Sequence, residues 1–206
     1  MGLLLALALS AADLAQSLQH KYDTIRDFSA EFVHTYTGGV LHKQITERGK
    51  VLIKKPGKMR WEYTSPEKKL FISDGVRVYQ YIPADNQVTQ GAVPKDDQPG
   101  APILFLAGKG NLMRDFTPSI AEVPKGSPPN SIALKLVPKA AQPDYDWLIL
   151  VVDQQSLTLR SLVTKDGQGG ESSISFVNLK ENVSPADKEF AFNIPRGVDV
   201  ISEPSR

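Results

Sequence analysis

Three histidines are the side chains of this chain best suited to acid–base or metal chemistry: His20, His34 and His42. Their spacing is not that of metal ligands, and the sequence contains no H-E-x-x-H motif. His20 falls in a predicted helix and His42 in a predicted strand beside Lys43, so both are expected on the surface. His34 is predicted to be a hydrogen-bonded strand residue. The alternative, a general base in a hydrolase, needs a nucleophile that the sequence does not reveal.

Other motifs of catalysis or phosphate binding are also absent from the sequence. There is no G-x-S-x-G, no P-loop and no G-x-G-x-x-G, and "GQGG" at 167–170 is predicted to be a hairpin turn. The lack of cysteine excludes disulfides, thiolate metal sites and cysteine nucleophiles. The net charge is +1, without a Lys/Arg stripe, so no nucleic-acid partner is expected. We therefore expect no catalytic site, no metal and no cofactor.

The chemistry that the sequence does favour is apolar binding. Every second side chain of 58–63 is large and apolar, so Met59, Trp61 and Tyr63 share one face of a predicted strand. Aromatic residues of neighbouring strands extend this face: Phe28, Phe32, Phe71 and Tyr79. Two interpretations remain open at this point. The face is either a plain packed core or the wall of a hollow that holds an apolar ligand.

Strands dominate the elements that must position these residues. Residues 28 to 93 predict a meander of about six antiparallel strands, and "SDG" at 73–75 is a strong hairpin signal. Five further strands are predicted over 131–137, 146–152, 156–164, 172–179 and 189–194. A helix is predicted from an N-cap at Asp13 to near Arg26. About eleven strands of this kind curl into a barrel or fold into a sandwich.

A short apolar insert, "APILFLAG", interrupts the strand pattern. Pro102 is typical of a first helical position and Gly108 of a helix end. Leu104, Phe105 and Leu106 make this helix apolar on every side, so it must be buried on several faces. We expect it to act as a plug or lid. Lys55, before Pro56 at a strand end, could donate hydrogen bonds to its exposed carbonyls.

The first twelve residues, "MGLLLALALSAA", differ from the rest of the chain. A compact apolar run followed by small residues is typical of a secretory signal, although no basic residue precedes the run here. The run is too short to span a membrane. The alternative is that it extends the first helix. We expect residues 1–12 to be a partial signal peptide and residues 13–206 to form a single domain.

The ordered motifs of the chain resemble those of the outer-membrane lipoprotein carrier family, LolA. The resemblance is carried by "GKVLIKKPGKMRWEY", "LFISDGVRVYQYIP", "APILFLAG" and "FAFNIPRGVDVI", and by the opening "DFSAEFVHTY". Each motif alone is weak, but their order and spacing over nearly the whole mature chain are specific. The resemblance implies an α+β fold, mainly β: an incomplete antiparallel barrel with a helical lid over an apolar cavity.

The resemblance also implies roles for particular residues. Lys55 falls where the family usually has an arginine that holds the lid closed, and lysine offers a point donor instead of a rigid fork. Met59 falls where phenylalanine is usual, Trp61 on the family tryptophan and Tyr79 on an aromatic position. The acyl cavity would then be lined by Phe28, Phe32, Met59, Trp61, Tyr63, Phe71, Tyr79, Leu104, Phe105 and Leu106.

By the same resemblance, the protein is expected to be a periplasmic monomer that binds triacylated lipoproteins. It would receive them from an inner-membrane lipoprotein-releasing ABC transporter and deliver them to an outer-membrane acceptor lipoprotein. Two alternatives stay open. One is a lipid- or lipoprotein-sensing module on the same fold, without transport, and the other is a hydrolase that uses His34.

Overall fold

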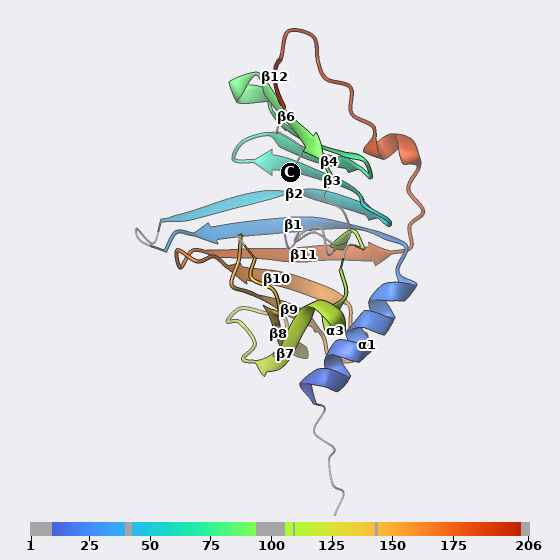
Figure 1. The fold of residues 1–206 in the computed structure, drawn as a ribbon, viewed down its shortest axis with the longest axis vertical. Helices are drawn as coiled ribbons and strands as arrows, with labels where there is room; N and C mark the ends of the chain where they lie inside the picture. Colours follow the sequence, from blue (N-terminus) through green and yellow to red (C-terminus); the bar gives the residue numbers. More distant parts are fainter. Residues whose placement is uncertain (1–9, 40–42, 94–105, 109, 143, 203–206) are drawn as a thin grey trace, which may run out of the picture.

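One large sheet organises the molecule. The structure, a computed structural model, describes residues 10–39, 43–93, 106–108, 110–142 and 144–202. Within these ranges twelve strands follow the order β12-β6-β5-β4-β3-β2-β1-β11-β10-β9-β8-β7 (Figure 1). β12 pairs with β6 in parallel and the other pairs are antiparallel. β7 and β12 form the two edges, so the barrel is incomplete.

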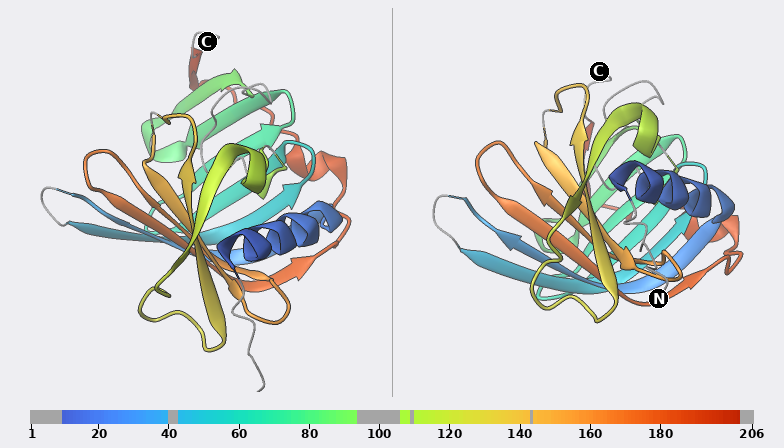
Figure 2. Two further views of the ribbon diagram at one scale, coloured as in Figure 1. Left: turned by 60° about the horizontal axis from the view of Figure 1, so that its bottom comes forward. Right: turned by 90° about the horizontal axis from the view of Figure 1, so that it is seen from below.

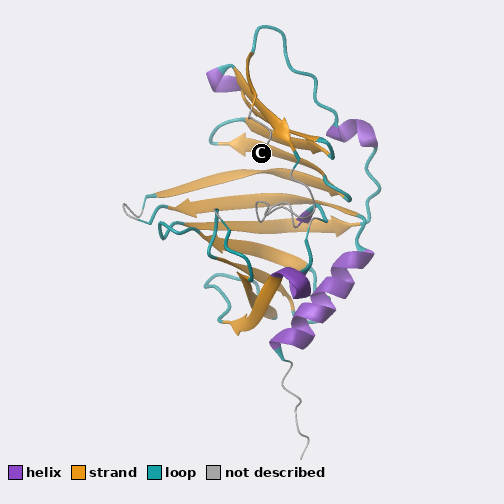
Figure 3. Ribbon diagram, in the orientation of Figure 1, coloured by secondary structure: helices purple, strands orange, loops and turns teal. Residues whose placement is uncertain are grey.

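The strands form two runs of sequential neighbours (Figure 3). β1 to β6 extend from the middle of the sheet toward one edge, and β7 to β11 lead from the other edge back to β1. Their bounds are β1 Asp27–Thr37, β2 Gln44–Lys54, β3 Lys58–Ser65, β4 Lys69–Asp74, β5 Arg77–Ile82, β6 Gln87–Ala92, β7 Phe116–Ala121, β8 Ser131–Pro138, β9 Trp147–Asp153, β10 Leu159–Lys165, β11 Glu171–Glu181 and β12 Asp199–Ser202. The predicted six-stranded meander is confirmed, because β1 to β6 pair in sequence order. The Asp74 carboxylate closes the predicted 73–75 turn by accepting from the backbone N–H groups of Val76 and Arg77, each at 2.7 Å.

Three details of the strand prediction are wrong. β7 and β12 were not predicted, and the segment 189–194 is not a strand. Instead the short helix η2 (Asp187–Phe190) ends there and extended chain follows. β7 contains Pro118 and all four residues of β12 are exposed, so neither has the alternating apolar pattern that reveals a half-buried strand. Phe190 and Phe192 alternate because they cover the sheet rather than join it.

The helix α1 (Ala11–Thr24) begins three residues earlier than predicted, since its N-cap is Ser10 and not Asp13. The Ser10 side-chain oxygen accepts from the Asp13 backbone N–H at 3.1 Å, so Asp13 lies within the first turn. The predicted boundary of a signal segment at residue 12 therefore falls inside α1, and residues 1–9 lie outside the described part of the chain. In the described ranges no helix has the length and apolar character needed to span a membrane.

The sheet curves, and its concave side carries α1 and the short helix α3 (Leu112–Asp115) (Figure 2). Leu14, Ala15 and Leu18 are the buried face of α1. The main hydrophobic core lies between these helices and the concave face of the sheet. The convex side carries the segment around η2, which contacts β3 and β4. The two sides of the sheet thus bury different apolar sets.

Candidate functional site

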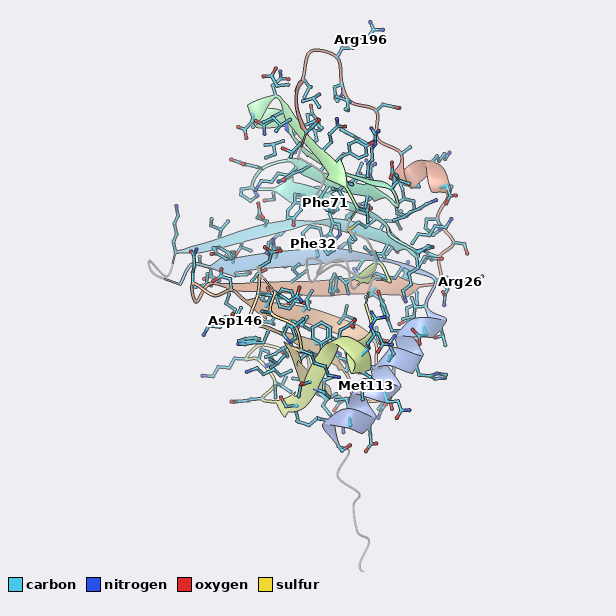
Figure 4. The ribbon with its side chains drawn as sticks, in the orientation of Figure 1. Arg26, Phe32, Phe71, Met113, Asp146 and Arg196 are labelled. Carbon is cyan, nitrogen blue, oxygen red and sulfur yellow. The ribbon has the colours of Figure 1, made fainter. Side chains whose placement is uncertain are left out.

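The concave face brings together the aromatic side chains of β1 and β3. Phe28, Phe32, Met59 and Trp61 are buried in the main core cluster, and Figure 4 labels Phe32 on β1. The Phe32 ring lies 4.9 Å from both the Trp61 and the Tyr63 rings, measured between centroids, in edge-on geometry. Such edge-to-face pairs add about 0.5–1.5 kcal/mol beyond the area that they bury.

Phe176 of β11 completes this aromatic cluster and was not predicted. Its ring lies 6.2 Å from Trp61 and 6.3 Å from Phe28. Strand alternation in 172–179 offered a signal, because Ile174 and Phe176 are its two buried positions. The pairing of β11 with β1, which brings Phe176 opposite Phe32, is not visible in the sequence because the two strands are far apart along the chain.

The predicted aromatic residues of β4 and β5 separate onto the two faces of the sheet. Phe71, labelled in Figure 4, pairs with Trp61 and packs against the core with Tyr63. Tyr79 instead pairs with Ile72, which pairs with Arg60 on the opposite face. The Tyr79 ring packs against Phe192 at 5.4 Å on the convex side.

The prediction that Tyr79 lines the concave face is therefore wrong. Side chains alternate across a strand, so a register difference of one residue moves a side chain to the other face. Across the 73–75 turn, the register brings Gln80 opposite Phe71 and leaves Tyr79 opposite Ile72. The aromatic residue after the hairpin is thus part of the convex cluster that the segment 190–192 covers.

The apolar interior beneath α1 is almost filled. A cavity of about 40 Å³ remains there. It is lined by Leu18, Lys21, Tyr22, Ile25, Phe28, Leu106, Leu112, Leu150, Val152, Leu157, Leu159, Leu179 and Glu181. Sites for small organic ligands usually measure about 300–1,000 Å³. A long acyl chain can enter this region only if α1, α3 or the segment at Leu106 moves away from the sheet.

The end of the predicted lid is fixed to the sheet. Of its predicted binding residues, Leu104 and Phe105 lie outside the described ranges, whereas Leu106 is 1% exposed. The next residue, Ala107, is fully buried, and its carbonyl accepts from the Gly57 backbone N–H at 2.8 Å. The Ser73 hydroxyl donates to the Gly57 carbonyl at 2.6 Å and holds the same turn from β4.

Lys55 joins this turn to α1. Its ammonium donates to the Tyr22 carbonyl at 2.5 Å and lies 3.2 Å from the centroid of the Tyr22 ring. Gly108 has a φ of +85°, and a side-chain carbon added to it would lie 3.1 Å from the Lys55 stem. The described partner of Lys55 is therefore a carbonyl of α1. Of the predicted partners at 102–106, residues 102–105 lie outside the described ranges, and the hydrogen bond of Lys55 goes to the Tyr22 carbonyl and not to Leu106.

Burial lowers the pKa of Lys55 to about 8. The main cause is the loss of water around the ammonium, which the charge of Asp23 opposes. The Lys55 ammonium, which links the 55–57 turn to α1, therefore keeps its positive charge at a cost in desolvation free energy. Burial also raises the pKa of Tyr22, so that phenol stays protonated beside the ammonium.

A polar cluster lies on the concave face at the far end of β1 from α1. His34 Nε2 is 2.9 Å from the Ser172 hydroxyl, and His34 Nδ1 is 3.5 Å from a Glu47 carboxylate oxygen. The Lys69 ammonium donates to the other Glu47 oxygen at 2.6 Å. Burial lowers the pKa of His34, and the Glu47 charge opposes this shift, while Lys69 adds to it. His34 is hence a hydrogen-bonded strand residue, as predicted.

The order Ser172, His34, Glu47 is that of a nucleophile, a base and an orienting acid, but its geometry is incomplete. The contact between His34 Nδ1 and Glu47 is 3.5 Å long, which is longer than the hydrogen bond that orients the base of a triad. Ser172 also lies within β11, paired with Tyr36 on one side and Thr164 on the other. Its backbone groups thus take part in strand pairing and are not arranged as an oxyanion hole.

Sequence comparison identifies the chain as a lipoprotein-carrier relative. The family model described as "Outer membrane lipoprotein carrier protein LolA" matches residues 23–193. The outer-membrane lipoprotein carrier protein of Methylobacillus flagellatus is 29% identical over 192 residues, which cover 93% of this chain and 90% of that protein. Its counterpart in Pseudomonas aeruginosa is 32% identical over 158 residues, covering 75% of this chain and 71% of that one.

A solved crystal structure shares the fold of this chain. The crystal structure of a conserved protein from Thermus thermophilus matches with a TM-score of 0.54. The match covers 92% of this chain and 99% of that one at 14% sequence identity. At this identity the likeness concerns the fold alone.

Proposed function

Because the chain belongs to the outer-membrane lipoprotein carrier family, LolA, we propose that it carries acylated lipoproteins and binds their acyl chains on the concave face described above. The observation that carries the proposal is the buried, largely aromatic face of β1 and β3 beneath two small helices. The coverage of most of the chain by the family model and by curated carriers supports it. The proposal is for a carrier that performs no catalysis.

A carrier of this kind is needed because hydrocarbon is costly to expose to water. Burial of acyl chains contributes about 0.8 kcal/mol per CH₂. A chain of roughly fifteen carbons therefore costs on the order of 12 kcal/mol to expose, and two or three chains multiply that cost. The concave face would offset most of this cost, and the helices above it would cover the face when no cargo is bound.

Because the interior is closed, an acyl chain can be loaded only after the structure opens. Since the cavity beneath α1 holds about 40 Å³, the cargo must displace the helices from the sheet. We propose that Phe28, Phe32, Met59, Trp61, Tyr63, Phe71 and Leu106 contact the acyl chains in the open state, with Leu104 and Phe105 as further contacts of the lid. Tyr79 is not among them, because it lies on the convex face.

The same proposal gives the cellular setting. Relatives named as outer-membrane lipoprotein carriers imply an exported protein of the periplasm. The donor would be an inner-membrane lipoprotein-releasing ABC transporter, and the recipient an outer-membrane acceptor lipoprotein. Removal of a signal peptide and a monomeric state remain predictions.

Trp61 provides the test of binding. The chain has two tryptophans, so Trp147→Phe leaves Trp61 as the single indole emitter. Titration of this variant with a triacylated lipopeptide should shift the emission of Trp61, because the indole exchanges packed protein neighbours for acyl chain. The deacylated peptide is the control and should produce no shift. An unchanged spectrum at saturating lipopeptide would mean that Trp61 belongs to a permanent core.

Lys55 is proposed as a weak latch, and its pKa makes the latch testable. In the unfolded chain a lysine titrates near its ordinary pKa of 10.5, and in the folded protein Lys55 titrates at about 8. Between these values the unfolded state binds more protons, so stability should rise with pH from about 8 to 10. The range ends at pH 10 because tyrosines of an unfolded chain ionise at about that pH and would add their own dependence.

We expect Lys55→Met to lose this rise, because methionine keeps an apolar stem without a titrating group. Chemical denaturation at several pH values between 8 and 10 measures it. Lys54→Met is the matched control, since Lys54 bonds to Asp187 and Pro185 away from α1, and it should keep the rise. Equal pH slopes in the wild type and Lys55→Met would contradict the burial of this ammonium.

A further inference from the structure

A small pocket opens beside the aromatic cluster, at the end of the concave face that lies away from α1. Its volume is about 220 Å³. We call it the polar pocket; its lining residues are Glu47, Trp61, Tyr63, Lys69, Leu70, Phe71 and Gln80. Apolar rings form one part of this wall, and charged or amide groups form the other. The pocket is therefore amphipathic, with a larger share of polar groups in its wall than the mainly apolar cavity beneath α1.

The Trp61 indole N–H is the feature that indicates a ligand. Trp61 is fully buried, and this N–H has no hydrogen-bond partner in the part of the chain that the structure describes. A buried donor without an acceptor costs about 1–3 kcal/mol, so such groups are rare unless they serve a purpose. A ligand that brings an acceptor to this wall would remove the cost.

The charges around the polar pocket indicate whether the hydrogen-bond acceptor of the ligand is neutral or anionic. The Lys69 ammonium is neutralised by Glu47, to which it donates at 2.6 Å. His34 is adjacent to Glu47, and burial lowers its pKa, which favours the neutral imidazole. Burial also raises the pKa of Tyr63 to about 12, so its phenol is neutral as well. The groups facing the pocket from β1 to β5 thus sum to no net charge, and the Glu47 carboxylate disfavours an anionic ligand.

We propose that the polar pocket binds the uncharged ester and amide carbonyls that join the acyl chains of the cargo to its headgroup. This inference rests on the proposed carrier function and gives the cargo an orientation. The hydrocarbon extends along the aromatic cluster toward α1, and the carbonyls lie at the Trp61 and Lys69 end. Trp61, Lys69 and Gln80 are the lining residues that carry N–H donors. The Trp61 N–H is buried in the closed state, so the cargo would reach it only as the interior opens.

A pair of synthetic lipopeptides tests the inference. Both carry two palmitoyl-length chains on a glyceryl-cysteine peptide, one through esters and one through ethers that lack the carbonyl oxygens. Displacement of a fluorescent fatty acid from the full-length protein measures both affinities. The ester probe should bind about tenfold more tightly than the ether probe, the effect of roughly one net hydrogen bond.

Two variants test whether the preference for the ester probe arises at the wall of the polar pocket that contains Trp61. Trp61→Phe removes the N–H and keeps an aromatic ring, so it should reduce the ester-to-ether ratio at least threefold. Trp147→Phe, at the other tryptophan, should leave the ratio unchanged. Near-ultraviolet circular dichroism checks that both variants are folded, and the wild-type ratio needs no variant at all.

The possible outcomes distinguish failure of the carbonyl site from failure of the proposed carrier function. Equal wild-type affinities for the two probes, or an unaltered ratio in Trp61→Phe, would overturn the carbonyl site while leaving the acyl carrier intact. Failure of both probes to bind would overturn the carrier proposal and this inference together. Cleavage of the ester probe, detected by mass spectrometry, would instead favour a hydrolase and also overturn the inference.

Discussion

Leu106→Ala is expected to destabilise the protein by about 2–5 kcal/mol without weakening its affinity for an acyl chain. Leu106 is 1% exposed and lines the 40 Å³ cavity beneath α1. Its truncation enlarges that cavity, and the surrounding strands can collapse only in part. An apolar void of this kind stays dry and accepts hydrocarbon, as engineered protein cavities do. The cargo would therefore fill the space that Leu106 occupies in the closed state.

The combination of lower stability and retained affinity distinguishes a lid residue from an ordinary core residue. Chemical denaturation measures the first quantity and lipopeptide titration the second. Ile120→Ala on the edge strand β7, where the side chain is 49% exposed, is the matched control and should change neither. Loss of affinity in parallel with stability would contradict the expectation that cargo fills the space left by the Leu106 side chain.

Gly49→Ala is expected to cost about 3 kcal/mol or more, because the sheet has no room for a methyl group at this position. A side-chain carbon built on Gly49 would lie 2.1 Å from the Glu62 carbonyl oxygen and 2.7 Å from the Phe32 ring. The first of these neighbours is backbone and the second is the centre of the aromatic cluster. The backbone of β3 must shift away from β2, and Phe32 must also move from its contacts with Trp61 and Tyr63.

Gly167→Ala tests whether the effect is specific. Gly167 lies in the turn between β10 and β11, and its nearest neighbour for an added carbon is an Asp146 oxygen at 3.8 Å. This variant should unfold at almost the same temperature as the wild type. A Gly49→Ala protein with wild-type stability and an unchanged near-ultraviolet spectrum would mean that Phe32 does not lie across Gly49.

The sequence predicts most of the fold because its local signals agree with the global arrangement. The alternation at 58–63 and the turn at 73–75 define neighbouring strands, and these strands pair in sequence order. The edge strands β7 and β12 could not be predicted from such local signals. Their faces are largely exposed, so no apolar period marks them, and only their pairing partners make them strands.

The candidate site is less predictable because it depends on register and on distant pairing. Tyr79 follows a clear hairpin, but its face depends on a single residue of register. The partner of Lys55 is a carbonyl of α1, a contact that the lid motif alone could not indicate. The Glu47–Lys69 pair joins two strands that are not neighbours in the sheet, so no short motif could reveal it.

Native mass spectrometry of the protein purified from a bacterial periplasm tests the carrier function most directly. We predict an adduct with the mass of a diacylated or triacylated species, which mild activation removes. If the purified protein is empty, added triacylated lipopeptide should form this adduct and its deacylated peptide should not. A protein that is empty as purified and also fails to bind the added lipopeptide would contradict the carrier function. The concave face would then be a permanent packed core.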